Sequence, residues 1–297
     1  MFYILTNEDD TTYSLNDYKI VCKWSSGLNK INNSDFLVFH NLNNGIDWYI
    51  KKGNYIRILL SLSYNKINRS WTNLPSIIDS WTNVQSIIDS VILSDRYFIY
   101  DPKTIKKFNL CVDENFISAV CRDGYVNVLE WWKTSGLPLK YDELALDCAS
   151  MNNKVNVLEW WLKSGLPLKY SENALDYASS NGSIDALDWW ANSGLELKYT
   201  KYALHRASLF LQINVLDWWY KSGLSLQYDA HVLGGASQNS STDALEWWYK
   251  SNLPLQCSAG SLRVMLKSKF DSYHIPVNII EWWYNVDFTY FNFLEKS

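Results

Sequence analysis

The sequence predicts a mostly α-helical solenoid built from helical pairs, with a small α/β module in front of it. Tryptophan provides the first observation, because twelve of the 16 tryptophans form six Trp-Trp pairs. The pairs recur every 29 residues until the last step, which is 35, and a period in this range is typical of repeat architectures. Between the pairs, apolar residues recur at spacings of three and four, which indicates helices. The pairs begin at Trp131, Trp160, Trp189, Trp218, Trp247 and Trp282.

The first helix of each unit is predicted from a capping residue and a stripe of alanine and leucine. In the unit of residues 171–199, Ser171 precedes Ala174, Leu175 and Ala178. Serine, threonine and aspartate side chains satisfy the free amides at the start of a helix. These residue types fill the whole column, which consists of Asp113, Asp142, Ser171, Thr200, Asp229 and Ser258.

A second helix is predicted around each Trp-Trp pair. It ends at a column that consists of Gly136, Gly165, Gly194, Gly223 and Asn252. Glycine with asparagine as the substitute is typical of a left-handed residue at the end of a helix. The Leu-x-Leu segment that follows, such as Leu195 and Leu197, predicts an extended link with both leucines facing inward. No unit can bury its apolar face alone, so we expect stacked units to share one core.

These columns resemble the ankyrin repeat. Residues 173–179 (NALDYAS) resemble the family's T-P-L-H-x-A-A, and residues 186–190 (ALDWW), with Gly194 after them, resemble its V-V-x-L-L-L-x-x-G. The usual unit has about 33 residues, and this one is shorter between Gly194 and Ala203. The resemblance therefore implies that the β-hairpin finger of the family is reduced here to a tight link.

The Trp-Trp pairs with SGLPLKY resemble the divergent ankyrin-like repeats of giant DNA viruses of the mimivirus type. The resemblance covers residues 112–286. Residues 2–7, 53–57 and 101–108 are similar, more loosely, to the module that precedes such repeats. It implies a protein-interaction scaffold, and we expect a viral protein that acts in the host cytoplasm.

Two domains are expected, an α/β module over residues 1–110 and a repeat solenoid over residues 111–297. In the first, residues 36–39, 55–60 and 96–100 are predicted strands. Residues 71–90 hold two tandem copies, WTNLPSIIDS and WTNVQSIIDS, which we interpret as an inserted loop. Residues 284–294 are rich in aromatic side chains and predict a cap on the last unit.

Composition excludes several classes of function. The net charge is −4 and the pI about 5.6, which argues against a nucleic-acid binder. No apolar run approaches the roughly 18 residues of a membrane helix. The five cysteines are scattered, which indicates reduced thiols in the cytoplasm and neither a disulfide framework nor a zinc site. With no catalytic motif, we expect no enzyme, no metal and no cofactor, and a monomer whose partner is a host or viral protein.

The tryptophans themselves have two possible roles. They can fill the core between units, with acidic residues such as Glu159 and Asp188 as acceptors for the indole N–H, or they can form an exposed ladder that stacks sugars or bases. Core packing is the favoured interpretation, and for the acidic column a solvated or indole-bonded role is favoured over a cation site. A small-ligand site or an enzyme within residues 1–110 stays open as a further alternative.

Candidate binding residues come from the columns that vary from unit to unit. Fixed columns have a packing reason, whereas variable positions on the inner helices of a solenoid line its concave face. Tyrosine and arginine are also enriched at binding hot spots. The candidates are Cys148, Met151, Tyr177, Ser180, Arg206 and Leu209.

Overall fold

The computed structural model describes residues 2–6, 11–13, 20–23, 27–30, 40–41, 55–64, 88–238, 241–257, 276–286 and 291–293. The chain divides into two compact units. One contains residues 1–116 and 127–139, and the other contains residues 117–126 and 140–297. Each unit is described by itself below, and the domain boundary expected at residue 110 stays a prediction.

The first unit contains an antiparallel sheet in the order β4-β7-β6-β1-β5. Its strands are β1 (Phe2–Thr6), β4 (Gly27–Lys30), β5 (His40–Asn41), β6 (Tyr55–Tyr64) and β7 (Ile88–Phe98). A separate hairpin joins β2 (Thr11–Tyr13) to β3 (Ile20–Lys23). Helix α2 (Pro102–Phe108) follows the sheet and begins with the Asp101 side chain capping the Lys103 amide at 2.9 Å.

The strand predicted at residues 55–60 is confirmed within β6, and most of the strand predicted at 96–100 lies in β7. The strand predicted at residues 36–39 and residues 71–87 of the duplicated segment lie outside the described residues. The loop interpretation is wrong for residues 88–90, because they open β7 and pair with β6 and β4.

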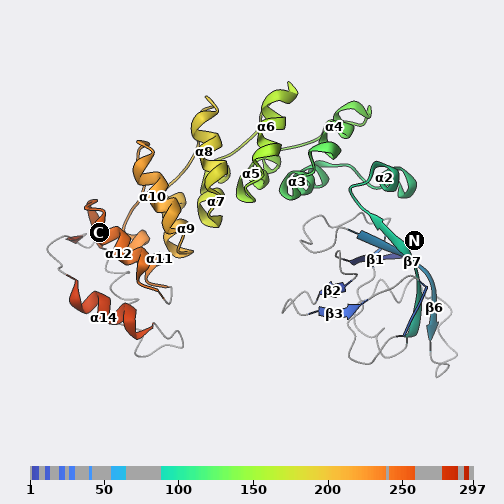
Figure 1. Cartoon of the computed structure of the whole chain (residues 1–297), viewed down its shortest axis with the longest axis horizontal. Coiled ribbons are helices and arrows are strands. Elements are labelled where there is room, and N and C mark those ends of the chain that lie inside the picture. Colours follow the sequence, from blue (N-terminus) through green and yellow to red (C-terminus); the bar gives the residue numbers. More distant parts are fainter. Residues whose placement is uncertain are drawn as a thin grey trace. The chain divides into compact units, whose positions relative to one another are not determined.

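After α2, the described part of the chain consists mainly of helical pairs. The predicted fold class is therefore confirmed. The first helices are α3 (Glu114–Asp123), α5 (Leu144–Met151), α7 (Asn173–Asn181), α9 (Tyr202–Leu209) and α11 (His231–Ala236). The second helices are α4 (Val126–Thr134), α6 (Val155–Ser164), α8 (Ile184–Asn192), α10 (Ile213–Lys221), α12 (Asp243–Lys250) and α14 (Val277–Asn285). From α5 to α12 the first helices lie on the inner side of the curved stack and the second helices on the outer side (Figure 1).

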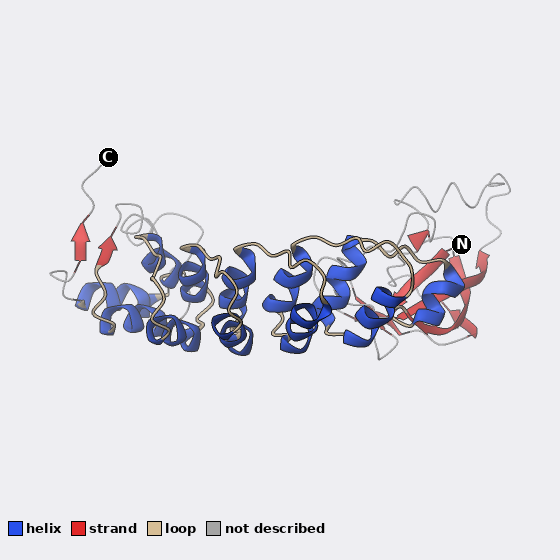
Figure 2. Ribbon diagram, turned by 90° about the horizontal axis from the view of Figure 1, so that it is seen from above, coloured by secondary structure: helices blue, strands red, loops and turns tan. Residues whose placement is uncertain are grey.

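The links between pairs run along one side of the stack (Figure 2). Near the end of the chain, β8 (Leu255–Cys257) pairs in parallel with β9 (Phe291–Phe293). Strand β9 lies within the segment expected to cap the solenoid. No described helix is long and apolar enough to cross a membrane.

The capping column works as the sequence predicts. In each described unit the side chain accepts a hydrogen bond from a backbone N–H two or three residues later. The acceptors are Asp113, Asp142, Ser171, Thr200 and Asp229, while Ser258 lies outside the described residues. The terminal column is also confirmed, since its four glycines have φ of 73–77° and Asn252 has φ of 55°.

The core consists of the alanine and leucine columns and the second tryptophan of each pair. Trp161, Trp190, Trp219 and Trp248 are fully buried. The expectation that both link leucines face inward is wrong for Leu137 and Leu139, which are 37% and 42% exposed. Tyrosine of the links packs on the core, as where the Tyr170 ring centre lies 4.7 Å from the Trp190 ring centre. The leucines of the next three links and Leu253 are half-buried, whereas Leu255 is buried as predicted.

One position is strained. The turn inside each pair uses a left-handed residue, namely Gly124, Asn153 and Gly182 in successive units, but Leu211 in the next, with φ of 55°. A leucine there costs about 1 kcal/mol or more. Asn153 also joins two units, because its side chain donates to Asp185 Oδ2 at 2.8 Å and accepts from the Ala186 amide at 2.9 Å.

We therefore expect Leu211→Asn to raise the free energy of unfolding by about 1 kcal/mol, measured by urea denaturation. The substitution relieves the strain, and Asp243 and Ala244 stand where Asp185 and Ala186 stand two units earlier. The reverse substitution, Asn153→Leu, should destabilise the fold by a similar or larger amount. An unchanged or lower stability of Leu211→Asn would contradict this account.

Candidate functional site

From Trp161 on, the second tryptophan of each pair is tied to the preceding unit by a hydrogen bond that its indole N–H donates. Trp190 donates to Ser150 Oγ at 2.8 Å, and Trp219 donates to Ser179 Oγ at 2.9 Å. The same bond joins Trp248 to Ser208 and Trp283 to Ser237, and in the first such pair Trp161 donates to Cys121 Sγ. Each buried ring therefore fixes the position of a first helix, 40 residues earlier in most units, which is the helix that carries the candidate binding residues.

From Trp189 on, the first tryptophan of each pair donates its indole N–H to a carboxylate of the preceding unit. Trp189 donates to Glu159 at 2.7 Å, Trp218 to Asp188 at 2.6 Å and Trp247 to Asp217 at 2.7 Å. Trp282 donates to Glu246 in the same way. The predicted indole-bonded role of the acidic column is thus confirmed, with the acceptor supplied by the neighbouring unit.

Lysines balance most of these carboxylates. Lys163 pairs with Glu159 at 2.9 Å and Lys250 with Glu246 at 2.9 Å, one helical turn away. The bond from the lysine is the main cause that lowers the pKa of Glu159 and of Glu246, and the indole bond adds to it. At Asp188 the equivalent position holds Asn192, whose side chain donates to the Asp188 backbone carbonyl instead.

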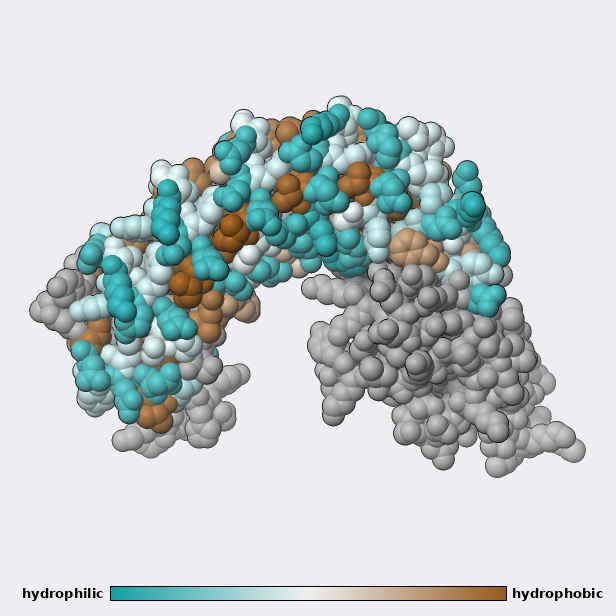
Figure 3. Space-filling view, viewed as in Figure 1, coloured by the Kyte–Doolittle hydropathy of each residue, from teal (hydrophilic) through white to brown (hydrophobic). Residues whose placement is uncertain are grey.

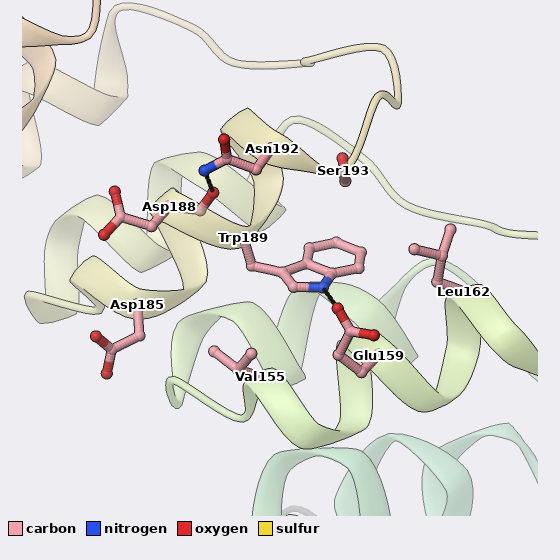
Figure 4. A pocket seen from close by; sticks show the side chains of 8 residues that line it. All are labelled: Val155, Glu159, Leu162, Asp185, Asp188, Trp189, Asn192 and Ser193. Carbon is pink, nitrogen blue, oxygen red and sulfur yellow. Dashed lines mark hydrogen bonds between the residues drawn. The ribbon is translucent and has the colours of Figure 1, made fainter.

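A shallow groove of about 380 Å³ opens on the outer side of α6 and α8. Trp189 lies in its middle between Val155 and Leu162, with the indole N–H directed at Glu159 (Figure 4). Asp185 and Asp188 stand at one end of it (Figure 4). Because the indole N–H is already bonded, the groove offers a ligand carboxylates and apolar surface.

The six candidate residues all lie on first helices. Cys148 and Met151 are on α5, Tyr177 and Ser180 on α7, and Arg206 and Leu209 on α9. All six side chains are half-buried. The structure thus places them along the inner row of helices, one pair per unit, as the column analysis predicts. Whether this face binds a partner stays a prediction.

Two of the candidates contact each other. The guanidinium carbon of Arg206 lies 4.6 Å from the centre of the Tyr177 ring, which is stacking distance for a cation and an aromatic face. The Tyr202 ring lies 5.8 Å away. Tyr202 and Phe210 were not among the predicted residues, although they are 50% and 54% exposed. Tyr202 belongs to a column that also varies (Leu144, Asn173, Tyr202, His231), so the same rule had the signal to find it.

The face shown in Figure 3 alternates hydrophilic side chains with smaller hydrophobic patches along the described units. No three His, Cys, Asp or Glu side chains in the described part of the chain are grouped to hold a metal ion. The thiol of Cys121 is buried, and burial raises its pKa well above the usual range, so it is unreactive at neutral pH.

A buried carboxylate joins the first helices of neighbouring units. Asp147 accepts from both the amide and the hydroxyl of Ser171, at 3.0 and 2.5 Å, and Asp176 accepts likewise from Thr200. Burial raises the pKa of both carboxyls, and these hydrogen bonds lower it in part. In the next unit the position holds His205, whose pKa is lowered by burial and by the nearby His231.

Asp147→Asn should retain the fold and be at least as stable as the wild type at pH 7, because an amide can accept from the Ser171 amide and donate to its hydroxyl. Asp147→Ala should lose about 1–3 kcal/mol, since it leaves both Ser171 groups unsatisfied. The folded-state pKa of Asp147 is raised, so its contribution to stability is largest at low pH and is lost as the pH rises through that pKa.

The difference in unfolding free energy between Asp147→Asn and the wild type should therefore shrink as the pH is lowered from 7 toward 4. Urea denaturation at several pH values measures it. A gap that is constant or grows toward low pH would show that the buried carboxylate is not the titrating group.

One comparison with known proteins bears on the repeat architecture. A model of the family described as ankyrin repeats (many copies) matches residues 146–189, which span α5 to α8. Among solved structures, the chain is similar to the human ASB11 ankyrin repeat domain, with 13% identity over 46% of this chain and 83% of that one and a TM-score of 0.31. No curated protein matches the chain. Residues 146–189 are thus similar to ankyrin repeats, and the 29-residue helical pairs extend on both sides of them.

Proposed function

We propose that the chain is a non-enzymatic protein-interaction module that binds its partner through the inner face of its first helices. The Arg206–Tyr177 stack supports this best. An arginine and a tyrosine from neighbouring units meet at a column that varies from unit to unit, beside alanine and leucine columns that are fixed by packing. Ankyrin-like repeats generally mediate protein–protein interactions, and the candidate surface consists of Cys148, Met151, Tyr177, Ser180, Arg206 and Leu209.

The rigid scaffold favours binding at this face. Each first helix is capped at its start and is held by an indole from the next unit. A partner therefore meets side chains that are already ordered, so little entropy is lost when it binds. The caps and the indole bonds between units thus support recognition of a folded protein or a peptide.

The alternative of sugar or base stacking on the tryptophans has little support. The second ring of each described pair is buried, and the first ring uses its N–H for a carboxylate. Among the described residues, no observation supports a ligand site or an enzyme within residues 1–110. We also propose residues 1–110 and 111–297 as the two domains, and a monomer in the host cytoplasm whose partner is a host or viral protein.

A viral origin rests on the sequence resemblance alone. The Trp-Trp pairs and the SGLPLKY links are the features that resemble the repeats of giant DNA viruses. The proposal includes no cofactor, no metal and no nucleic acid. These parts guide the choice of host-cell lysate for the experiment below.

The test is an affinity pull-down from that lysate with mass spectrometry, using the full chain and a Tyr177→Ala, Arg206→Ala variant. We expect the variant to lose at least about tenfold of the partner recovered by the wild type, since truncating hot-spot tyrosine and arginine costs 2 kcal/mol or more. A matched control, Tyr220→Ala with Lys221→Ala, removes the same kinds of side chain from the exposed outer face of α10.

Circular dichroism and thermal unfolding must show that both variants are folded. The control should retain the partner. Equal recovery by the wild type and the Tyr177→Ala, Arg206→Ala variant would exclude the inner face as the binding surface. Loss of the partner with the control would move the site to the outer helices.

A further inference from the structure

We propose that Arg206 binds a carboxylate of the partner, an aspartate or glutamate side chain next to an apolar residue. This inference rests on the proposed function, because it names the chemistry of the partner at the inner face. It follows from three properties of Arg206: its orientation between aromatic rings, its lack of an ionic partner among the described residues, and the apolar surface beside it.

The rings hold the guanidinium without using its donors. Tyr177 lies against the guanidinium at 4.6 Å and Tyr202 lies at 5.8 Å. Each ring presents its face to the cation, and this contact uses none of the five N–H donors of the guanidinium. A half-buried arginine held in this way is pre-organised for the two parallel hydrogen bonds that a carboxylate accepts.

The nearby carboxylates are committed elsewhere. Both oxygens of Asp176 accept from Thr200, at 2.9 and 2.5 Å. Asp229 is bonded to Lys201 at 2.7 Å and to His231. Among the described residues, the Arg206 guanidinium makes no ion pair or hydrogen bond. Its charge acts on Asp176 only at a distance, where it offsets part of the burial that raises the pKa of that carboxyl, so its N–H donors are left for a partner.

A single carboxylate matches this charge better than a phosphate. Lys201, which directly precedes α9, is neutralised by Asp229, so Arg206 acts alone. Phosphorylated segments are usually bound by clusters of arginine, which bring more than one positive charge to the group. One planar guanidinium suits one carboxylate in size, charge and geometry.

The surface beside Arg206 is apolar and open. Tyr202 and Phe210 stand one turn before and one turn after it on α9, and both are at least half exposed. On the α11 side, the equivalent position is Gly235, which packs closely on His205 and has no side chain to cover the column. We therefore expect an aromatic or aliphatic residue next to the acidic one in the partner segment.

The test uses phage-displayed random 12-residue peptides selected on the immobilised full chain. We expect enrichment of aspartate or glutamate beside an aromatic or aliphatic residue. The strongest peptide is then made with a fluorescent label, and its affinity is measured by anisotropy for the wild type, Arg206→Gln and Arg206→Lys, with Tyr220→Ala as the control outside the site.

Arg206→Gln should weaken the peptide at least tenfold, and Arg206→Lys should weaken it by less, because it keeps the charge and loses the planar fork. When the acidic residue of the peptide is exchanged for its amide, the affinity of the wild type should fall by the same factor as in Arg206→Gln. The affinity of Arg206→Gln should not fall further with this exchange. Tyr220→Ala should leave the affinity unchanged.

The role of Arg206 would be overturned if the enriched peptides lacked an acidic residue, or if the losses of affinity from Arg206→Gln and from the amide peptide were additive. Either result would leave the proposed function standing. A phosphoserine peptide that binds tenfold more tightly than its glutamate counterpart through Arg206 would overturn the choice of a carboxylate. If the wild type selects no peptide, the carboxylate proposal is rejected, and the pull-down separately decides whether the chain binds a protein at all.

Discussion

The buried indole N–H of the second tryptophan is the interaction on which the solenoid depends. A ring of this size fills the space between two units, but its N–H cannot stay unsatisfied inside the core without a cost of about 1–3 kcal/mol. The acceptor is a serine on the first helix of the preceding unit, as in the bond from Trp190 to Ser150. Each unit therefore packs in one register on the one before it, and the repeat period follows from that register.

The same register organises the polar groups. The first tryptophan donates to a carboxylate of the previous unit, and the buried Asp147 and Asp176 hold the capping residues of the following units. These bonds run in both directions along the stack, so neighbouring first helices are fixed at a constant distance. That distance brings Tyr177 of one unit into contact with Arg206 of the next. The candidate binding surface is thus a consequence of the packing, although none of its residues takes part in the core.

Residue types with a local physical meaning were predictable. A capping aspartate, serine or threonine and a left-handed glycine act within a few residues of the chain, and the structure confirms the columns from Asp113 to Asp229 and from Gly136 to Asn252. The errors concern exposure. The spacing of Leu137 and Leu139 predicts that both side chains face the core, but both are exposed. A tyrosine of the link packs on the core instead, as Tyr170 does on Trp190. Tyr202 was missed although its column varies from unit to unit, and Phe210 was missed because its exposure depends on neighbours that lie far away in the sequence.

The period, the helical pairs, their ends and the set of variable positions follow from the amino-acid sequence alone, because these depend on spacing and on local hydrogen bonds. Which atoms of neighbouring units meet depends on the folded stack. An acidic residue precedes every tryptophan pair in the sequence. In the structure, the indole N–H groups of Trp189, Trp218 and Trp247 donate instead to the carboxylate 30 residues earlier. The stack of Tyr177 on Arg206 and the commitment of Asp229 to Lys201 likewise depend on how closely two units approach, and no single unit of the chain contains that distance.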